Sequence, residues 1–480
     1  MSQSQTVDRN GKAYSRAWFI FILLMGTFTM SISQSSLSTA YPTLMHAFGI
    51  SADTVQWLTT GFMLIMCVSM PISPWLLANI NFKHLFMGAL ALFDVGSLMI
   101  VLTPQNWGVG GFWFMMVGRA LEAFAVGILF PSYQSVMLEI TPEEERGTTM
   151  GIAGLVMGSA LAVGPIISGI VLKFFTWKSL FIFFMIVITI VFIAAWAGLI
   201  RDVMPRHESE LDWLSVFLSI GLIGILAVIN QIGKAHVNWA LMVVILLVSI
   251  LMIVAFCRRQ LTLETPLLEL RVLKTFNYDL AVLLTSISYI ALIVTTIIFP
   301  LYYQGVLKVS PFVSGMSLVP GAVFLSILNP LTGRMADKLG FKLTMLIGMT
   351  MIVVGWVLAL FLVAKQSLGW MIFNAMIIEG GNAFVMMPAV TMGANSLPDE
   401  LVPHGTAVIT TVRQVLGSTG VAVATLILTN ATAACLHRGL GTMAANIHGY
   451  RMVFITMVVV EVIGLVLALM MKDNKSAKNN

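Results

Sequence analysis

The chain has 480 residues, of which 58% are hydrophobic and only 10% are charged, and its mean hydropathy is +0.95. Soluble domains carry about 25% charged residues, so this composition excludes a soluble protein and indicates an integral membrane protein. The formal net charge of +5 is explained by basic loops beside anionic lipid, so no nucleic-acid partner is expected.

The apolar residues form about fourteen stretches of roughly 20 residues, each long enough to cross about 30 Å of hydrocarbon as a helix. The first stretch is too long for a cleavable signal and lacks a small-residue cleavage site, so we expect it to remain as the first span. The predicted spans are 17–42, 54–77, 84–103, 108–138, 147–172, 178–200, 213–232, 238–257, 278–304, 313–333, 342–363, 369–396, 405–431 and 451–471.

Two polar connectors divide these spans into groups of six, two and six. The sequence therefore predicts an all-α integral membrane protein with about 14 transmembrane helices, in which two inserted helices separate two pseudo-symmetric six-helix bundles. The expected units are an N-terminal bundle at 1–200, a linker with the two extra helices at 201–276 and a C-terminal bundle at 277–480. The inserted spans contain no acidic residue, so we expect them at the periphery.

Basic residues are distributed unevenly between the two sides of the predicted spans. With the N-terminal tail placed inside, 17 of the 26 Lys and Arg residues lie on the inner side and 7 on the outer side. Cytoplasmic loops of membrane proteins carry such an excess. We therefore expect a multi-pass protein of the cell (cytoplasmic) membrane with both termini in the cytoplasm.

Ionisable residues within the predicted spans are the first candidates for function, because charge there is costly and usually faces a partner or a cavity. They are Asp94, Arg119, Glu122, Glu379, Arg413 and Glu461. Asp94 lies on a span expected to be peripheral, and Glu461 lies near the middle of the last span. We expect structural roles for both and keep Asp94 as a further candidate for proton coupling.

Glu122 and Glu379 occupy equivalent positions in the two halves. Alignment of the fourth and twelfth spans on Pro131 and Pro388, a shift of 257 residues, places Glu122 on Glu379. Glu122 is either functional or the structural partner of Arg119, three residues before it on the same helix. Glu379 has no basic neighbour in the sequence and is therefore the preferred proton carrier, with Glu122 as the second candidate.

The fifth span carries small residues at a helical spacing, namely Gly154, Gly158 and Ala162. Pro165 removes a backbone donor and is expected to bend the helix near Leu161. A second helix can then approach closely, and simple helix packing explains the pattern as well as a functional role does.

A basic loop, Gly333–Lys342, lies between two apolar runs, and a degraded copy of it lies at Pro74–Lys83. Such repeats are typical of transporters built from two related halves. Asp337 can accept hydrogen bonds from the free amides of a following helix or pair with a basic neighbour, and Gly340 permits a sharp turn. The degraded copy has Ala78 in place of the acid. The loop is predicted to be a conformational hinge or a tight turn.

Taken together, these features resemble the major facilitator superfamily of transporters, in its fourteen-span branch of drug:proton antiporters. The resemblance covers nearly the whole chain. The segments that carry it are Arg119 to Pro131, Gly158 to Gly169, Leu301 to Gly321, Gly333 to Lys342 and Val412 to Gly420.

The resemblance implies that some of these residues control the conformation. In the family the basic loop is a cytoplasmic latch, the Gly-Pro run of the fifth span is characteristic of exporters, and the arginine of the thirteenth span braces that span. The fourth and twelfth spans line a central cavity from opposite sides. The residues implied as conformational are Arg119, Gly158, Gly164, Pro165, Gly169, Gly333, Arg334, Asp337, Gly340, Lys342 and Arg413.

The first span departs from the family pattern. The family usually has an aspartate and an asparagine ahead of the proline, whereas this chain has Ser33 and Ser38 ahead of Pro42. Either Glu122 and Glu379 have taken over proton coupling, or the coupling is altered or absent.

The expected function is therefore proton-coupled export of amphipathic, cationic drugs or toxic compounds by alternating access, without a catalytic residue. Each buried carboxylate can hold a proton or a cation, and competition for the site couples the two fluxes. The residues expected to contact substrate are Glu122, Glu379, Gln34, Ser33, Ser38, Tyr302, Gln304, Asn374 and Asn382, with Tyr303 beside them.

The alternative is a related carrier that moves an endogenous lipid, amino acid or metabolite, with or without protons. A membrane enzyme or sensor is disfavoured because no nucleophile elbow or cluster of His, Cys and Asp is evident. Cys67, Cys257 and Cys435 have unrelated spacings, so neither a disulfide nor a metal is expected. We expect no cofactor, since the proton gradient supplies the energy, and a monomer whose partners are small amphipathic substrates, protons and membrane lipid.

Overall fold

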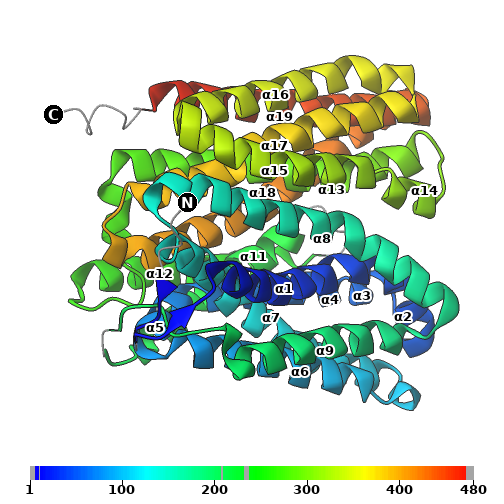
Figure 1. The fold of residues 1–480 in the computed structure, drawn as a ribbon. Helices are drawn as coiled ribbons and strands as arrows, with labels where there is room; N and C mark the ends of the chain where they lie inside the picture. Colours follow the sequence, from blue (N-terminus) through cyan, green and yellow to red (C-terminus); the bar gives the residue numbers. More distant parts are fainter. Residues whose placement is uncertain (1–5, 10, 207–208, 232–236, 472–480) are drawn as a thin grey trace.

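The computed structural model describes residues 6–9, 11–206, 209–231 and 237–471, and nearly all of them are helical (Figure 1). The short N-terminal strands are β1 (Thr6–Val7) and β2 (Ala13–Tyr14). The elements of the first half are α1 (Arg16–Ser36), η1 (Leu37–Ala40), α2 (Tyr41–Phe48), α3 (Ala52–Val55), α4 (Trp57–Ser69), η2 (Met70–Ile72), α5 (Ser73–Asn79), α6 (Phe82–Val101), η3 (Gln105–Trp107), α7 (Val109–Glu139), η4 (Glu143–Glu145), α8 (Arg146–Phe174), α9 (Trp177–Ala194) and η5 (Ala195–Leu199).

The inserted segment and the second half are also helical. The inserted elements are α10 (Trp213–Ser219), α11 (Gly221–Gln231), α12 (Trp239–Thr262) and η6 (Leu270–Lys274). The second half contains α13 (Phe276–Gly305), α14 (Pro311–Met316), α15 (Val319–Leu339), α16 (Phe341–Leu362), η7 (Val363–Lys365), α17 (Leu368–Asn395), η8 (Asp399–Leu401), α18 (Val402–His437) and α19 (Thr442–Met470).

Within the described residues, 13 helical segments are long and apolar enough to cross a membrane, and the shorter apolar segment Trp213–Ile229 adds one more. Helices satisfy their own backbone hydrogen bonds, which hydrocarbon requires of any spanning segment. The predicted all-α fold with about 14 helices is therefore confirmed.

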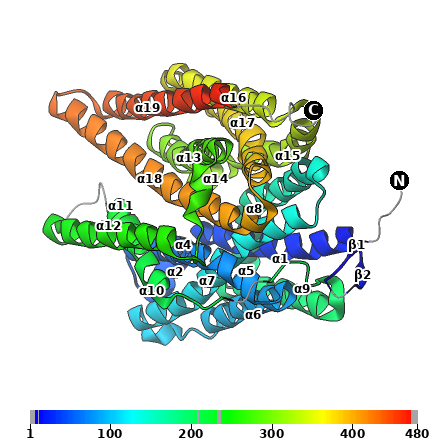
Figure 2. The ribbon, with the colours of Figure 1, turned by 90° about the vertical axis from the view of Figure 1, so that its left-hand side faces the viewer.

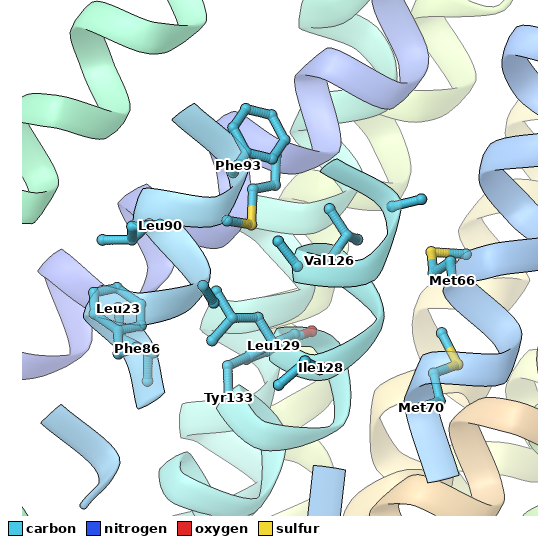
Figure 3. Close-up of a cluster of buried hydrophobic side chains, with 14 of the residues drawn as sticks. Leu23, Met66, Met70, Phe86, Leu90, Phe93, Val126, Ile128, Leu129 and Tyr133 are labelled. Carbon is cyan, nitrogen blue, oxygen red and sulfur yellow. The ribbon is translucent and has the colours of Figure 1, made fainter. Parts of the chain in front are cut away.

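The two halves repeat the same helix packing. The neighbours α6–α7, α1–α8 and α6–α9 of the first half recur in the second half as α16–α17, α13–α18 and α16–α19. In the first bundle, Leu23 of α1, Phe86 and Leu90 of α6, and Val126 and Leu129 of α7 belong to one buried cluster (Figure 3). Lipid tails are as apolar as these side chains, so close van der Waals packing holds the helices together.

The inserted helices lie beside the junction of the two halves. Leu226 of α11 packs against Leu64 and Cys67 of α4 and against Val415 of α18. The next helix, α12, is mostly exposed and lies at the outside of the molecule (Figure 2). At its end, Arg259 donates two hydrogen bonds to Asp212 and thereby lowers the pKa of that carboxyl to about 2.

Both ends of the described chain lie on one side of the molecule, here named the terminal end. The Arg16 guanidinium pairs with Glu145 at 2.6 Å, just before α8 begins. Lys342, at the start of α16, donates to the carbonyl of Met471 at 2.8 Å, just after α19 ends. The end of α15 also meets the start of α8, through Asp337 and Gly147. An even number of crossings gives this arrangement.

The predicted basic loop is largely helical, which corrects the sequence interpretation. Helix α15 continues to Leu339, so Gly333, Arg334 and Asp337 lie on its last turns. The residues between the two glycines are good helix formers, and the chain turns only at Gly340, where φ is +101°.

The equivalent turn of the first half is bound by the connector that follows α9. Ser209 donates its backbone N–H to the Asn79 side chain at 2.8 Å, and the Ser209 carbonyl accepts from the Trp75 indole at 3.1 Å. Asp202 accepts from the Phe82 backbone N–H at 3.1 Å, at the start of α6. The connector thus satisfies polar groups around the position where Ala78 replaces the acid.

We predict that the terminal end faces the cytoplasm, because the excess of basic residues lies there. In a variant whose three cysteines are replaced by serine, Lys475→Cys should resist a membrane-impermeant maleimide in intact cells and react after permeabilisation. Lys173→Cys, from the opposite end, is the matched control and should react in intact cells. Labelling of position 475 in intact cells would contradict the topology.

Candidate functional site

Glu122 is held in a buried network inside the first bundle. Its carboxylate accepts from Arg119 at 2.5 Å, one turn earlier on α7, and from the Ser97 hydroxyl of α6 at 2.6 Å. Arg119 also donates to the Ser33 hydroxyl of α1 at 3.3 Å, and its guanidinium lies 4.3 Å from the centre of the Phe62 ring. The intrahelical ion pair that the sequence left as an alternative is formed.

Close contact between α6 and α7 creates this network. A Cβ atom on Gly118 would lie 2.6 Å from the carbonyl of Gly96, and one on Gly96 would lie 2.9 Å from the Glu122 side chain. Because both positions are glycine, the two backbones touch and Ser97 reaches Glu122. The sequence analysis did not identify Ser97 as a partner of Glu122. The only feature that could have indicated it is that Ser97 is a small polar residue on the same predicted span, three positions after Asp94.

Glu379 has a different environment inside the second bundle. It is 1% exposed, and among the described residues no hydrogen bond or ion pair reaches it. A Cβ atom on Gly321 of α15 would lie 2.7 Å from its carboxyl carbon, so the glycine makes room for the acid. The Tyr303 side chain of α13 lies within electrostatic range, and its buried hydroxyl has no partner.

These contacts place the two equivalent acids in separate bundles. Glu122 contacts Ser97 of α6 and has a cationic partner, whereas Glu379 lies against Gly321 of α15 and has no such partner among the described residues. An ionised carboxylate without a partner in a dry interior costs several kcal/mol, whereas a protonated one carries no charge. Of the two equivalent acids, Glu379 is therefore the one at which gain and loss of a proton changes the local charge most directly.

The residues expected to contact substrate are distributed over several environments. Tyr302 donates to the Val363 carbonyl at 2.8 Å, and the Asn382 amide donates to the Ile378 carbonyl at 3.0 Å and accepts from Ser288. These bonds lie within the second bundle, and they occupy the polar atoms of Tyr302 and the Asn382 side chain.

The remaining candidates keep more of their polar groups free for a ligand. Both amide atoms of Asn374 are buried, and neither has a hydrogen-bond partner in the described part of the chain. Gln304 is exposed and donates to Ser314 at 3.2 Å, and Gln34 is partly exposed. The side chain of Ser38 lies outside the described residues.

Asp94 and Glu461 form no hydrogen bond with Glu122 or Glu379 among the described residues, and Asp94 lies within electrostatic range of Glu122. Asp94 on α6 accepts from the Thr189 hydroxyl of α9 at 2.9 Å, and its other oxygen is buried without a partner. Glu461 on α19 is fully buried, and neither of its oxygens has a partner. Arg413 on α18 is 8% exposed and lies over the ring of Tyr289.

Asp337 joins the two bundles at the terminal end. Its carboxylate accepts hydrogen bonds from the backbone N–H of Gly147 at 2.9 Å and of Thr148 at 2.7 Å, and from the Thr148 hydroxyl at 2.6 Å. Free amides at a helix start attract an acid, so Asp337 caps α8. The sequence predicted such a contact with a following helix, whereas the structure forms it with a helix 190 residues earlier. We call this contact the latch.

Glycine residues bring α8 and α15 together along the latch. A Cβ atom on Gly333 would overlap the carbonyl of Gly147, and one on Gly151 would lie 2.5 Å from the carbonyl of Asn329. Gly154 and Gly158 continue this contact toward the middle of α8. The predicted close approach of a second helix to the fifth span is formed here, with α15 as the partner.

The rest of the Gly-Pro run faces a different helix or open space. A Cβ atom on Gly164 would overlap Ser35 of α1, which donates to the Ala160 carbonyl at 2.8 Å. Pro165 lies inside α8, and no atom lies within 4 Å of a Cβ atom placed on Gly169.

Arg146, the first residue of α8, extends the connection between the bundles. It donates to the Asn395 side chain at 3.0 Å, at the end of α17, and pairs with Asp399 at 3.2 Å. The two bundles are thus joined at the terminal end by the latch and by this ion pair.

The chain is similar to a known protein family and to individual bacterial proteins. Residues 23–421 and 281–480 match the Major Facilitator Superfamily. An uncharacterised MFS-type transporter of Bacillus subtilis, YcnB, is 34% identical over 463 residues, which cover 96% of each chain. The lincomycin resistance protein LmrB of Listeria monocytogenes is 33% identical over 464 residues, 94% of this chain and 96% of that one.

A solved structure has a similar fold. The proton:xylose symporter XylE superposes with a TM-score of 0.64 over 95% of this chain and 96% of its own, at 11% identity. At this identity the likeness concerns the fold alone.

We predict that Asp337→Asn weakens the closure of the terminal end. Asparagine keeps an acceptor but removes the charge at the start of α8, which should destabilise the closed arrangement by about 1 kcal/mol. Spin labels at the exposed positions 143 and 339 should then show a larger population of long distances, and transport should slow with little loss of substrate binding. A large binding defect in a folded variant would contradict the latch.

The glycine contacts give a second prediction. Gly333→Ala inserts a methyl group against the carbonyl of Gly147, so it should separate α8 from α15 and lengthen the same spin-label distance. Gly169→Ala is the matched control, because its methyl group meets no atom within 4 Å. Equal distance distributions in the two variants would show that close contact at Gly333 does not hold the end closed.

Proposed function

The chain belongs to the major facilitator superfamily, and we propose that it is a proton-coupled antiporter that exports amphipathic, cationic compounds, drugs among them, by alternating access. Its membership of this superfamily and its many apolar helices identify it as a multi-pass membrane transporter. The names of the LmrB relatives, which are lincomycin resistance proteins, support export of drugs. We place the protein in the cell membrane with both termini cytoplasmic.

The observation that carries this proposal is the isolated carboxyl group of Glu379. A buried acid without a cationic partner can hold a proton in one state and a cationic substrate in another, and competition between them couples the two movements. A proton that moves inward gains about 2.3 kcal/mol per 100 mV, and a monovalent cation that leaves in exchange loses the same amount, so a one-to-one exchange is driven by the pH gradient.

In the Arg119–Glu122 pair, Glu122 supplies the negative charge that the first span lacks. Ser33 stands where the family usually carries an aspartate, and it lies 3.3 Å from the Arg119 guanidinium. The negative charge beside Arg119 comes instead from Glu122, on the same helix. We therefore assign proton exchange to Glu379 and assign to Glu122 the role of holding Arg119 and the electrostatics of the first bundle.

The latch provides the conformational part of the cycle. Alternating access requires the contacts at one end to break while those at the other end form. The bonds of Asp337 to the start of α8 are few and charge-assisted, so they hold the terminal end closed without making closure permanent.

We predict that Glu379→Gln abolishes uphill export and leaves the protein folded, because glutamine keeps the shape of the side chain but cannot change its charge. Detergent-solubilised wild-type protein should release protons when ethidium is added, and the variant should not. Export of ethidium into vesicles should lose its dependence on a pH gradient in parallel. Glu400→Gln, at an exposed position, is the matched control.

Glu122→Gln should behave differently. It leaves a buried arginine without its anion, so we expect a lower thermal midpoint and weaker ethidium binding, while substrate-induced proton release persists. If both acids serve one transport path, the effect of the double substitution on ethidium export should differ from the sum of the two single effects. Unchanged proton release and export in both single variants would refute the assignment and direct attention to Asp94.

A further inference from the structure

Arg413 is a buried cation without an anionic partner. Its side chain is 8% exposed, and its Nε and Nη1 atoms are buried without a hydrogen-bond acceptor. None of the ion pairs formed among the described residues includes it. Arg119 of α7 also has two buried nitrogens without an acceptor, but its charge is paired with Glu122. The charge of Arg413 has no such anion among the described residues.

The surroundings of Arg413 are aromatic and polar, with both bundles contributing. Its guanidinium carbon lies 5.2 Å from the centre of the Tyr289 ring of α13, and the Tyr289 hydroxyl donates to Gln414 at 3.0 Å. Tyr133 of α7, in the first bundle, lies within electrostatic range of Arg413. Tyr133 accepts from Gln134 at 3.3 Å (Tyr133 is labelled in Figure 3).

The cluster lies between the two bundles. Helices α7 and α18 pack against each other, and Thr410 of α18 donates to Gln134 of α7 at 3.5 Å. Arg413 is 11 residues into α18, about 16 Å from its start. Tyr289 is partly exposed, so the cluster is not sealed inside one bundle.

An anion is the ligand that this chemistry fits. A buried guanidinium without a counter-charge is costly, and a bound anion would offset that cost. The planar fork of arginine matches the two oxygens of a carboxylate, and tyrosine rings offer flat apolar surface to the body of the ligand.

We propose that Arg413, with Tyr289 and Tyr133, forms a substrate subsite that binds the carboxylate of amphipathic aromatic compounds. The transporter then accepts carboxylates and zwitterions besides cations. This inference rests on the proposed function for the place of the subsite in the transport path. It does not depend on which residue carries the proton.

The test is equilibrium binding to the purified full chain in lipid nanodiscs, without a pH gradient. The two probes are naphthalene-2-carboxylate and its neutral counterpart naphthalene-2-carboxamide. Wild-type protein should bind the carboxylate at least about tenfold more tightly. Arg413→Gln should remove this preference, and Arg413→Lys should keep part of it because the charge remains but the fork is lost. Lys173→Gln, which removes a positive charge at an exposed position, should keep it fully.

A second measurement protects the test against misfolding of the variant. The carboxylate should raise the thermal midpoint of the wild-type protein, and the carboxamide should raise it less. Equal binding of the two probes to wild type, or a preference that survives in Arg413→Gln, would overturn the inference. Failure of proton-driven ethidium export in wild type would instead refute the proposed function and leave this binding result unaffected.

Discussion

A charge that is buried in a membrane protein must be paired, neutralised by a proton or matched by a ligand, and this constraint organises the interior of the protein. Arg119 meets it by pairing with Glu122. Asp337 meets it through the free amides at the start of α8. Glu379, Glu461 and Arg413 have no such partner in the described structure. Glu379, the equivalent of Glu122 in the second half, is assigned to the proton, and Arg413 is assigned to an anionic group of the substrate.

The two halves are alike in helix packing but unlike in charge. The acid of the basic turn survives only in the second half, where it reaches across to the first bundle. In the first half Ala78 replaces it, and Ser209 and Asp202 of the connector bind the surrounding polar groups instead. The bundles are therefore joined asymmetrically, and the connector that follows α9 binds the basic turn of the first half only.

Sequence patterns that depend on local composition predicted most of the fold. Hydropathy located most spans to within a few residues, as for the predicted span 369–396 and helix α17 (Leu368–Asn395), because insertion depends on each segment separately. The last span was predicted at 451–471, whereas α19 (Thr442–Met470) begins nine residues earlier. Contacts between distant segments carried no such local signal. The partner of Asp337 lies 190 residues away, Ser97 is an unremarkable serine on α6, and the tyrosines around Arg413 come from two other helices. The helical state of Gly333–Leu339 was missed because glycine and charge in a short run resemble a loop.

The central claim is that Glu379 is protonated in the substrate-free protein and loses its proton when a cationic substrate binds. Infrared difference spectroscopy on adding ethidium measures this directly, because a protonated carboxyl group and a carboxylate absorb at different frequencies. The account predicts loss of a protonated carboxyl band in wild type and in Glu122→Gln, and no such change in Glu379→Gln. The same band loss in Glu379→Gln would contradict it.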